Sequence, residues 1–436
     1  MEFHDFQIRA WTVDKKHAAV LVHSSPAGAM QQPEKVVLDW VKLNALSKIF
    51  QLASGQAKEE MIAPQLTEGG RELAGMIFPD SILGLFIRSL AQLDPEDGLR
   101  VRLCLDRALS DLPWEYLVLP DATGLKSPGG FLVLDDRVSL VREPPKPGQK
   151  KLTLRKKQRL LFFGTRLCAA SGDDLWKTAE ERDSLFKALE PASAHLVTRA
   201  VLSDETDCQT ALRLSGFPID IFHYSGHTDV ENSVGYLVAK DVDLGSQNVE
   251  KLYANTLGRL LRGAGTTLAV FSACNSGRWV FVEPLLQAGV PVVIGAQGLV
   301  YVPVAIAFCQ RLYSALAIGL SLDESVTWAR LHLLEPGVLP ESVKWQWGAF
   351  MVYMQTPEAI LFPKPRKPQI VAQQNAARMA RQVTIINVTQ NIGTIHGGKV
   401  IGISGNITAK ALDKKVRKTV QKRKIKIQKQ YDSNKT

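Results

Sequence analysis

Four short apolar runs, separated by segments of helical spacing, constrain the fold of this chain more than any other feature. They are RLLFFGTRL (159–167), IDIFHYSGH (219–227), TTLAVFSAC (266–274) and VPVVIGA (290–296). Strands that are apolar along their whole length are typical of a parallel sheet covered by helices on both faces. We therefore expect an α/β fold with a mostly parallel sheet. Antiparallel additions are expected at its edges, because YLVAKD (236–241) resembles a hairpin arm.

The amino-terminal part has its own pattern. FQIRAW (6–11) and HAAVLVH (17–23) predict a β-hairpin, and helical spacing follows at 41–52 and 81–93. Alternating residues in GLRVRLCLD (98–106) predict a half-buried strand. A stretch rich in Pro and Lys then predicts a linker at 146–158. The uncharged stretch 288–309 contains glycines and prolines, so we expect a strand, a turn and a helix start there, not a membrane helix.

Charge divides the chain into two parts. Residues 359–436 hold 17 Lys+Arg and 2 acids, a net charge of +15, whereas the remainder carries −5. We expect a basic linker at 359–382 and a basic tail at 409–436. Five scattered cysteines and the absence of an amino-terminal apolar run predict a protein of the reducing cytoplasm.

Between linker and tail lies an imperfect two-rung repeat. Residues 386–392 (INVTQNI) align with 401–407 (IGISGNI), and residues 383–408 contain no acid and no proline. We expect this segment to form a β-rich, amyloid-like signalling motif that self-associates or binds an activator. A flexible glycine-rich linker is the alternative.

Neither a metal nor a cofactor is expected. No cysteine pair has the C-x-x-C spacing of a structural zinc site. The segment 393–399 fits the first part of a phosphate loop, but Val400 stands where that motif requires Ser or Thr.

His227 and Cys274 are the candidate catalytic residues. Each ends one of the apolar runs, and functional residues of open parallel sheets gather at the carboxyl ends of the strands. If the two strands are neighbours, the thiol and the imidazole lie side by side, which is the arrangement of a nucleophile and its base. His223 lies four residues before His227. We interpret it as a buried, hydrogen-bonded structural histidine next to the site, not as a second catalytic one.

FHYSGH (222–227), LAVFSACNSG (268–277) and AGVPVVIGAQ (288–297) together resemble the CHAT peptidases, relatives of caspases and separase. LPWEYLVLPD (112–121) and WGAFMVY (347–353) extend the resemblance to residues 1–360. It implies a caspase-like α/β fold with a pseudo-caspase half at 1–145 and a catalytic half at 159–358. In the LPWE segment we interpret Trp114 and Glu115 as packing and capping residues.

The resemblance implies a cysteine endopeptidase with His227 as base and Cys274 as nucleophile. The backbone N–H groups of Thr228 and Cys274 are the expected oxyanion hole, and Thr228 stands where the family usually has glycine. The segment GLVYVPVA (298–305) also departs from relatives that carry a tryptophan and an aspartate, so an acidic pocket residue stays unassigned. The implied setting is bacterial conflict, such as antiviral defence, or regulated cell death, with a partner protein as substrate.

A non-catalytic adaptor is the alternative function. Eleven Lys+Arg at 410–435 suit weak contact with nucleic acid or an anionic membrane. Thiol alkylation discriminates the two, because it should abolish peptidase activity and leave salt-sensitive tail binding intact.

Overall fold

The computed structural model describes residues 1–49, 59–144, 152, 155–169, 171–203, 206–214, 218–243, 246, 249–357 and 359–363. The predictions for the repeat at 383–408 and for the tail at 409–436 lie outside these residues. Most of the two predicted linkers, 146–158 and 359–382, also lies outside them.

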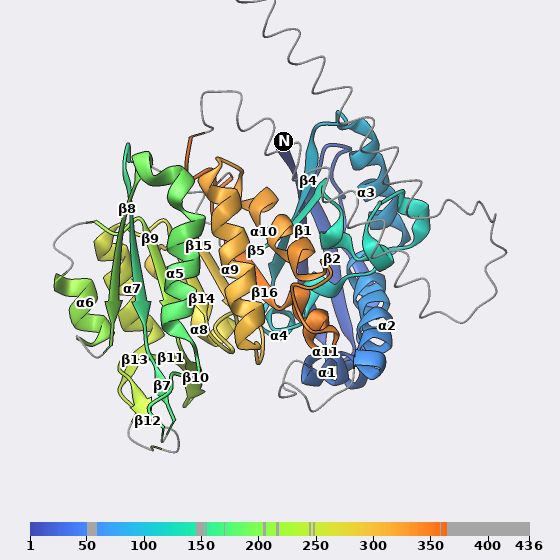
Figure 1. Ribbon diagram of the computed structural model, residues 1–436. Helices are drawn as coiled ribbons and strands as arrows, with labels where there is room; N and C mark the ends of the chain where they lie inside the picture. Colours follow the sequence, from blue (N-terminus) through green and yellow to red (C-terminus); the bar gives the residue numbers. More distant parts are fainter. Residues whose placement is uncertain are drawn as a thin grey trace, which may run out of the picture. The chain divides into compact units, whose positions relative to one another are not determined.

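Within the described residues, eleven strands form one sheet in the order β3-β2-β1-β4-β5-β16-β15-β14-β9-β6-β8 (Figure 1). Adjacent strands are parallel except at β1–β2, β2–β3 and β15–β16. These strands are β1 (Phe3–Asp14), β2 (His17–Ser24), β3 (Glu34–Val37), β4 (Gly98–Leu105), β5 (Val138–Glu143), β6 (Gln158–Gly164), β8 (Leu196–Leu202), β9 (Ile221–Ser225), β14 (Leu268–Ser272), β15 (Val292–Ala296) and β16 (Phe350–Met354). The expected mostly parallel α/β sheet is confirmed.

Two small sheets accompany the large one in the described part of the chain. The first is antiparallel and contains β10 (Thr228–Glu231), β11 (Val234–Val238) and β13 (Lys251–Tyr253). The second pairs β7 (Leu167–Cys168) with β12 (Val242–Asp243). YLVAKD does contribute an antiparallel strand, β11, but that strand belongs to the separate sheet. The expectation that it extends an edge of the main sheet is wrong.

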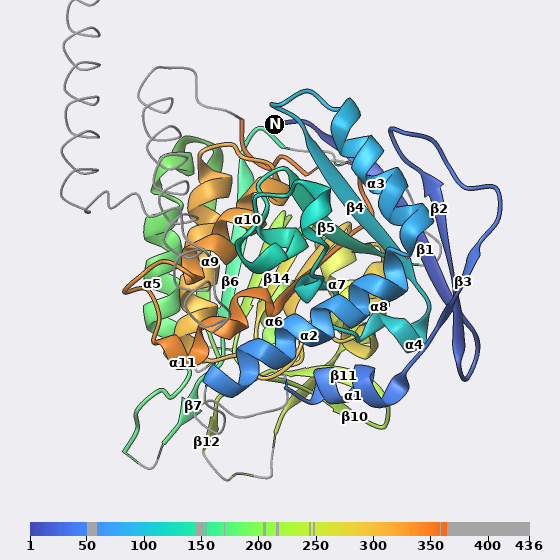
Figure 2. The same ribbon diagram turned by 90° about the vertical axis from the view of Figure 1, so that its right-hand side faces the viewer.

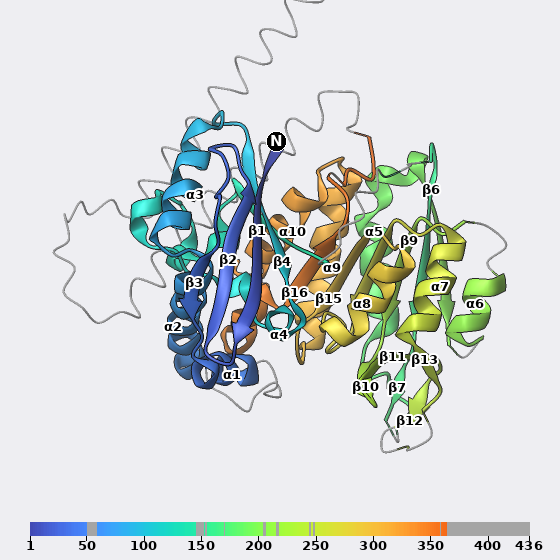
Figure 3. The same cartoon turned by 180° about the vertical axis from the view of Figure 1, so that it is seen from behind.

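Helices cover both faces of the sheet in the carboxyl-terminal half. In the described part of the chain, the α-helices are α1 (Trp40–Ile49), α2 (Glu59–Ile77), α3 (Asp80–Gln92), α4 (Arg107–Ser110), α5 (Thr178–Ala188), α6 (Cys208–Leu214), α7 (Ala254–Ala264), α8 (Trp279–Ala288), α9 (Val302–Ala317), α10 (Leu322–Leu333) and α11 (Glu341–Lys344). Helices α5 and α9 lie on the face seen in Figure 1, and α7 and α8 lie on the opposite face (Figure 3). The short 3-10 turns are η1 (Trp114–Tyr116), η2 (Asp121–Thr123), η3 (Pro128–Gly130), η4 (Leu132–Leu134), η5 (Glu190–His195) and η6 (Trp345–Gly348).

Alternation along the strands separates two hydrophobic layers. Ile221 and Val270 belong to the layer that includes α5 and α9, whereas Phe222 and Phe271 belong to the layer that includes α7 and α8. Side chains two residues apart on a strand share a face. The odd-numbered residues of β9 and the even-numbered residues of β14 therefore face α5 and α9.

The amino-terminal half begins with the expected hairpin, β1 and β2. Helix α3 packs against this half of the sheet (Figure 2). Phe86 of α3 meets Phe6 of β1 edge-on, with ring centroids 5.6 Å apart, and Phe78 lies 5.3 Å from Phe86. Such edge-to-face pairs contribute to stability beyond the area that they bury.

Strand β4 departs from the half-buried strand expected at 98–106. The first six residues of β4 are all buried. Arg100 and Arg102 are among them, because both arginines have acidic partners. Arg100 pairs with Asp323 of α10 at 2.7 Å, and Arg102 pairs with Glu143 of β5 at 2.5 Å. Asp5 bridges the two arginines. The alternation in the sequence predicted that these two charges face solvent. Ion pairs with carboxylates that are distant in sequence allow the charges to be buried instead.

The carboxyl end of the sheet's central strand is followed by three further core residues. Ala359, Leu361 and Phe362 are buried and belong to the main hydrophobic layer. The body of the protein therefore extends to Phe362, past the boundary expected at 358.

No single helix in the described residues is long and apolar enough to cross a membrane; a bent pair, Ile62–Ile77 with Asp80–Gln92, meets that test only when both helices are joined across a 93° break. The uncharged stretch at 288–309 contains β15 and the first half of α9, as expected.

Candidate active site

Strands β9 and β14 bring His227 and Cys274 to the same edge of the sheet. The two strands are parallel neighbours, and Ser225 is the register partner of Ser272. His227 and Cys274 each lie two residues beyond these partners. The Gly226 N–H continues the pairing by donating to the Ser272 carbonyl at 3.3 Å. The expected adjacency of the two strand ends is thus present in the fold.

Tyr224 fixes the backbone that carries His227. The Tyr224 hydroxyl accepts from the His227 N–H at 3.1 Å and lies 2.9 Å from the His227 carbonyl. It also lies 3.0 Å from the Thr165 hydroxyl. A Cβ at Gly226 would come within 2.0 Å of that Thr165 oxygen, so the turn requires glycine for close packing. The strand therefore ends in a rigid turn that presents His227.

The His227 side chain is half-buried and stacks on the indole of Trp176. The two ring centroids are 5.7 Å apart and the ring planes differ by 15°. Burial lowers the pKa of the His227 imidazole below its ordinary value, and the nearby Asp229 carboxylate opposes that shift. At neutral pH the imidazole is therefore uncharged and able to accept a proton.

Cys274 lies in the turn between β14 and α8, where Val300 meets its sulfur. The Val300 N–H donates to Sγ at 3.4 Å, and the Val300 carbonyl lies 3.8 Å from Sγ. Burial raises the pKa of the Cys274 thiol, and the hydrogen bond from Val300 offsets part of that rise. The shifts at Cys274 and His227 together favour a neutral thiol beside a neutral imidazole.

The turn after Cys274 is held against β15. Asn275 adopts a left-handed backbone with φ 59°, and its N–H donates to the Gly298 carbonyl at 2.9 Å. The Ser276 hydroxyl accepts from the Ala296 N–H at 2.9 Å. A Cβ at Gly277 would lie 2.6 Å from the Gly295 carbonyl oxygen. This close approach explains the small residues of the SACNSG segment and fixes the position of the Cys274 backbone.

Thr228 connects the two sides of the site. It is the first residue of β10, it is buried, and its hydroxyl donates to the Cys274 carbonyl. A glycine at this position could not make that bond. The structure thus gives the threonine a side-chain contact in addition to the backbone N–H expected to serve the oxyanion.

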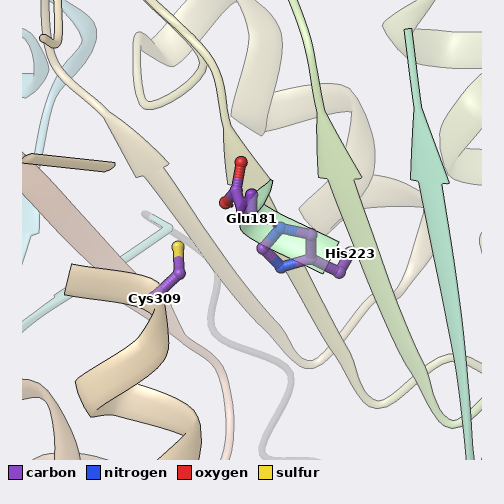
Figure 4. Close-up of side chains that lie close together, drawn as sticks. All are labelled: Glu181, His223 and Cys309. Carbon is purple, nitrogen blue, oxygen red and sulfur yellow. Dashed lines mark hydrogen bonds and ion pairs between the residues drawn. The ribbon is translucent and has the colours of Figure 1, made fainter. Parts of the chain in front are cut away.

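His223 lies on β9 in a buried polar cluster with Glu181 of α5 and Cys309 of α9 (Figure 4). Its Nε2 is 3.1 Å from Glu181 Oε1, and its Nδ1 is 3.2 Å from the Tyr313 hydroxyl. The ring also stacks on Phe162 at 5.2 Å. These contacts agree with the expected buried, hydrogen-bonded histidine.

The same cluster is where the described residues could hold a metal ion. The ligand atoms of Glu181, His223 and Cys309 all lie within 4.8 Å of one another, and a thiolate, an imidazole and a carboxylate are ligands that Zn²⁺ accepts. The second carboxylate oxygen of Glu181 already accepts from the Ser225 hydroxyl at 2.6 Å. Burial raises the pKa of the Cys309 thiol well above its ordinary value, which disfavours the thiolate that a metal requires. The arrangement fits a hydrogen-bonded anchor of α5 on β9.

Nearby acids are mostly neutralised. Glu231 pairs with Lys251 at 2.7 Å, and Asp241 pairs with Arg166 at 2.7 Å. Asp229 is exposed and accepts from the adjacent Val230 N–H at 2.8 Å. The carboxylate nearest in sequence to His227 therefore exerts the opposing influence on its pKa.

Sequence patterns did not reveal Trp176, Glu181 or Val300 as neighbours of the site. Trp176 lies two residues before α5, which begins at Thr178. Asp174 accepts from the Thr178 N–H at 2.8 Å, so an Asp four residues before the helix was the available signal.

Trp114 and Glu115 belong to the buried 3-10 turn η1. Trp114 is fully buried and donates to the Leu109 carbonyl at 2.9 Å. Glu115 is also fully buried, and it pairs with Arg142 of β5, with Oε1 3.1 Å from the arginine Nε. Trp114 has the expected packing role, whereas Glu115 is a core ion-pair partner and not the expected helix cap.

The CHAT domain family model matches residues 68–355, a range that includes His223, His227, Thr228 and Cys274. A search of curated protein sequences finds no match.

Among solved structures, the chain is similar to the Arg-specific cysteine proteinase gingipain R, with 12% identity, a TM-score of 0.44 and coverage of 71% of this chain and 76% of the other. It is also similar to the pro- and mature-domain complex of RgpB from Porphyromonas gingivalis, with 12% identity, a TM-score of 0.45 and coverage of 70% and 78%. The Saccharomyces cerevisiae separase–securin complex matches with 14% identity and a TM-score of 0.38 over 73% of this chain, which spans 20% of that chain.

The CHAT model covers more than half of the chain, and it includes both strand ends described above. This chain therefore belongs to the CHAT domain family.

Proposed function

We propose that the protein is a cysteine endopeptidase in which Cys274 is the nucleophile and His227 is the general base. The observation that carries the proposal is the register of β9 and β14, which sets the two residues at matching positions beyond Ser225 and Ser272. Family membership supports it, since both residues lie within the matched range.

The chemistry begins from the neutral pair that burial favours. His227 accepts the proton of the Cys274 thiol as the sulfur attacks the peptide carbonyl, and a thioester forms after the amine leaves with that proton. A water molecule, activated by His227, then hydrolyses the thioester and releases the free thiol. Transfer of the proton during attack avoids a separately stable thiolate in this buried environment.

The oxyanion of each tetrahedral intermediate would be held by the backbone N–H groups of Cys274 and Thr228. The Thr228 hydroxyl ties its own strand to the Cys274 carbonyl, which supports a fixed geometry between the two donors. Loss of one such donor typically reduces kcat by about 10²–10³-fold.

Substrate and setting are part of the proposal. We infer a partner protein as substrate, cleaved in the cytoplasm during bacterial conflict, such as antiviral defence, or regulated cell death. The CHAT family match and the scattered free cysteines support this setting. We also infer that an activator releases the peptidase, because the Cys274 sulfur is engaged in a hydrogen bond with the Val300 N–H.

A non-catalytic adaptor is the second candidate, and the strongly basic composition of 410–435 favours it. In that function the tail binds nucleic acid or an anionic membrane, and binding weakens steeply as salt is raised.

The test compares the wild-type chain with Cys274→Ala and His227→Ala in a proteome extract, with new protein amino termini mapped by mass spectrometry. We expect cleavage with the wild type and none with either variant, while thermal stability changes little because both residues lie in half-buried turns. Cys168→Ala is the matched control and should retain cleavage, since Cys168 is also a half-buried free cysteine. Wild-type cleavage by Cys274→Ala would exclude Cys274 as the nucleophile, whereas a wild-type chain that cleaves nothing would favour the adaptor.

A further inference from the structure

We propose that Trp176 is a positioning residue for His227, holding the imidazole by stacking on one of its faces and shielding that face from water. The inference rests on the proposed role of His227 as the base. It concerns how that base is oriented, which neither the family match nor the sequence motifs address.

The contact joins two segments that are distant in sequence. The Trp176 indole and the His227 imidazole are 5.7 Å apart and nearly parallel, with ring planes 15° apart. His227 lies at a turn, and its backbone is fixed by Tyr224. The imidazole can still rotate about its side-chain bonds, and a flat partner on one face restricts that rotation. Trp176 thus supplies a constraint on the ring that the backbone contacts do not supply.

Trp176 is itself firmly held. The backbone N–H of Trp176 donates to Asp174 Oδ1 at 3.0 Å. Oδ2 of the same carboxylate accepts from the backbone N–H of Thr178 at 2.8 Å. Lys177, between the tryptophan and the helix, adopts a left-handed backbone with φ 53°. That conformation is unfavourable for a residue with a Cβ and persists only where the surroundings impose it. The surrounding structure therefore constrains the backbone next to Trp176.

The same end of α5 also fixes the strand beneath His227. Glu181, in the first turn of the helix, contacts His223 at 3.1 Å (Figure 4). Its other carboxylate oxygen accepts from the Ser225 hydroxyl at 2.6 Å. Both His223 and Ser225 lie on β9, the strand that leads into His227. One helix end thus holds the strand through Glu181 and the ring through Trp176.

The charges and polar groups around His227 define what Trp176 changes. The Asp229 carboxylate of β10 raises the pKa of the imidazole. The Tyr224 hydroxyl of β9 contacts the His227 backbone. Cys274 lies at the matching position beyond the neighbouring strand. The indole covers one face of the imidazole ring. Its removal admits water, which stabilises the imidazolium and raises the pKa of His227 toward its ordinary value. An attractive cation–π contribution would act in the other direction, but burial sets the direction of the shift in the intact protein.

The experiment measures the titration of His227 by NMR in the full chain with isotopically labelled histidine. The His227 signal is assigned by its loss in His227→Asn. We expect the pKa to rise in Trp176→Ala and to stay near the wild-type value in Trp176→Phe, which retains a flat ring. Leu175→Ala is the matched control, because Leu175 is the adjacent apolar residue and its side chain is 44% exposed. Its His227 signal should titrate as in the wild type.

Kinetics on a cleaved substrate provide the second readout. Trp176→Ala should lower kcat about 10- to 100-fold with little change in KM, as expected for a misoriented base, and Trp176→Phe should recover most of the loss. A rise in KM with an unchanged kcat and an unchanged His227 titration would overturn the inference, because it would make Trp176 a wall of the substrate site. An unchanged titration and unchanged kinetics would also overturn it.

The experiment distinguishes failure of this inference from a folding defect and from failure of the proposed function. If Trp176→Ala does not fold, Trp176→Gln takes its place, and the same pKa rise is expected. The NMR titration needs no substrate, so it tests Trp176 even if the wild-type chain proves to cleave no protein.

Discussion

At the scale of single residues, burial rather than ion pairing sets the chemistry of the two candidate catalytic groups. Burial lowers the pKa of His227 and raises the pKa of Cys274. Both shifts disfavour the thiolate–imidazolium pair that many cysteine peptidases hold at rest. In the proposed mechanism, the resting Cys274 thiol is therefore a weak nucleophile that reacts by transferring its proton to His227 during attack.

The pH dependence of kcat/KM follows from these directions. His227 acts as a base only when neutral, so activity is lost as pH falls through its lowered pKa. We expect the acid limb to lie below pH 6.5, the ordinary histidine value of about 6.5 being the upper bound. Asp229 raises the pKa of His227, so Asp229→Asn should move this limb to still lower pH. The measurement is kcat/KM between pH 4 and 9, and a limb above the ordinary value would contradict the burial argument.

Alkylation of the thiol supplies a check without substrate. In His227→Ala no base remains, so the rate of Cys274 alkylation by iodoacetamide should rise mainly above pH 9, in line with its raised pKa. A rate that is already maximal at neutral pH would show a stabilised thiolate.

Thr228 gives a prediction about the departure from glycine. Thr228→Val keeps the size of the side chain but removes the hydroxyl that donates to the Cys274 carbonyl. We expect kcat to fall between about 10-fold and 100-fold, because the turn that carries the nucleophile loses a tether. Thr228→Ser retains the hydroxyl and should keep most of the activity. Equal activity in Val and Ser variants would mean that only the backbone of this residue matters.

At the scale of elements, the buried ion pair between β5 and η1 is central to the amino-terminal half. Arg142 is almost completely buried and donates to Glu115 and to the Leu112 carbonyl at 3.0 Å. Glu115→Gln leaves the guanidinium without its counter-charge, so the free energy of unfolding should fall by about 3–5 kcal/mol. Urea unfolding followed by circular dichroism measures this loss.

An exposed ion pair is the matched control for this prediction. Glu68 and Arg71 lie 3.6 Å apart with 69% and 58% of their side chains exposed. Glu68→Gln should change stability by less than about 1 kcal/mol. Similar losses in both variants would mean that burial does not determine the cost.

The strands were the most predictable elements, and their long-range pairings were the least. Continuous apolar runs predicted β6, β9, β14 and β15, because burial on both faces leaves a direct trace in composition. The burial of Arg100 and Arg102 was not predictable, since their partners Asp5 and Asp323 lie far apart in the sequence.

The candidate site divides in the same way. His227 and Cys274 were identifiable because both follow apolar strands, and the neighbouring register of those strands was the expected one. Trp176 and Val300 were not identifiable, because each reaches the site from a loop whose path no local pattern encodes. Catalysis by the pair, the oxyanion role of Thr228 and the self-association of 383–408 stay predictions.

At the scale of the whole molecule, the chain after β16 contributes to the core before the basic region begins. Leu361 and Phe362 are buried, and the Ala359 carbonyl accepts from the Leu322 N–H of α10 at 2.8 Å. A truncation after Phe362 should therefore unfold cooperatively and elute as a compact particle. A truncation after Thr356 removes these contacts and should unfold at clearly lower urea concentration, since each large apolar side chain lost from a core costs about 2–5 kcal/mol. An insoluble 1–362 fragment would mean that the remaining residues belong to the folded body.

The position of β16 in the sheet has a consequence for the order in which the protein is made. This strand is the last of the sheet in sequence, yet it lies between β15 and β5, where the two halves join. While the ribosome is still translating, β15 has an open edge and the halves share no strand pairing across this position. The sheet can close only after residues 350–354 have left the exit tunnel. The Tyr353 hydroxyl of this strand donates to the Gly277 carbonyl at 2.9 Å, so this support for the turn after Cys274 also forms late in synthesis. A nascent chain interrupted before that point therefore lacks it.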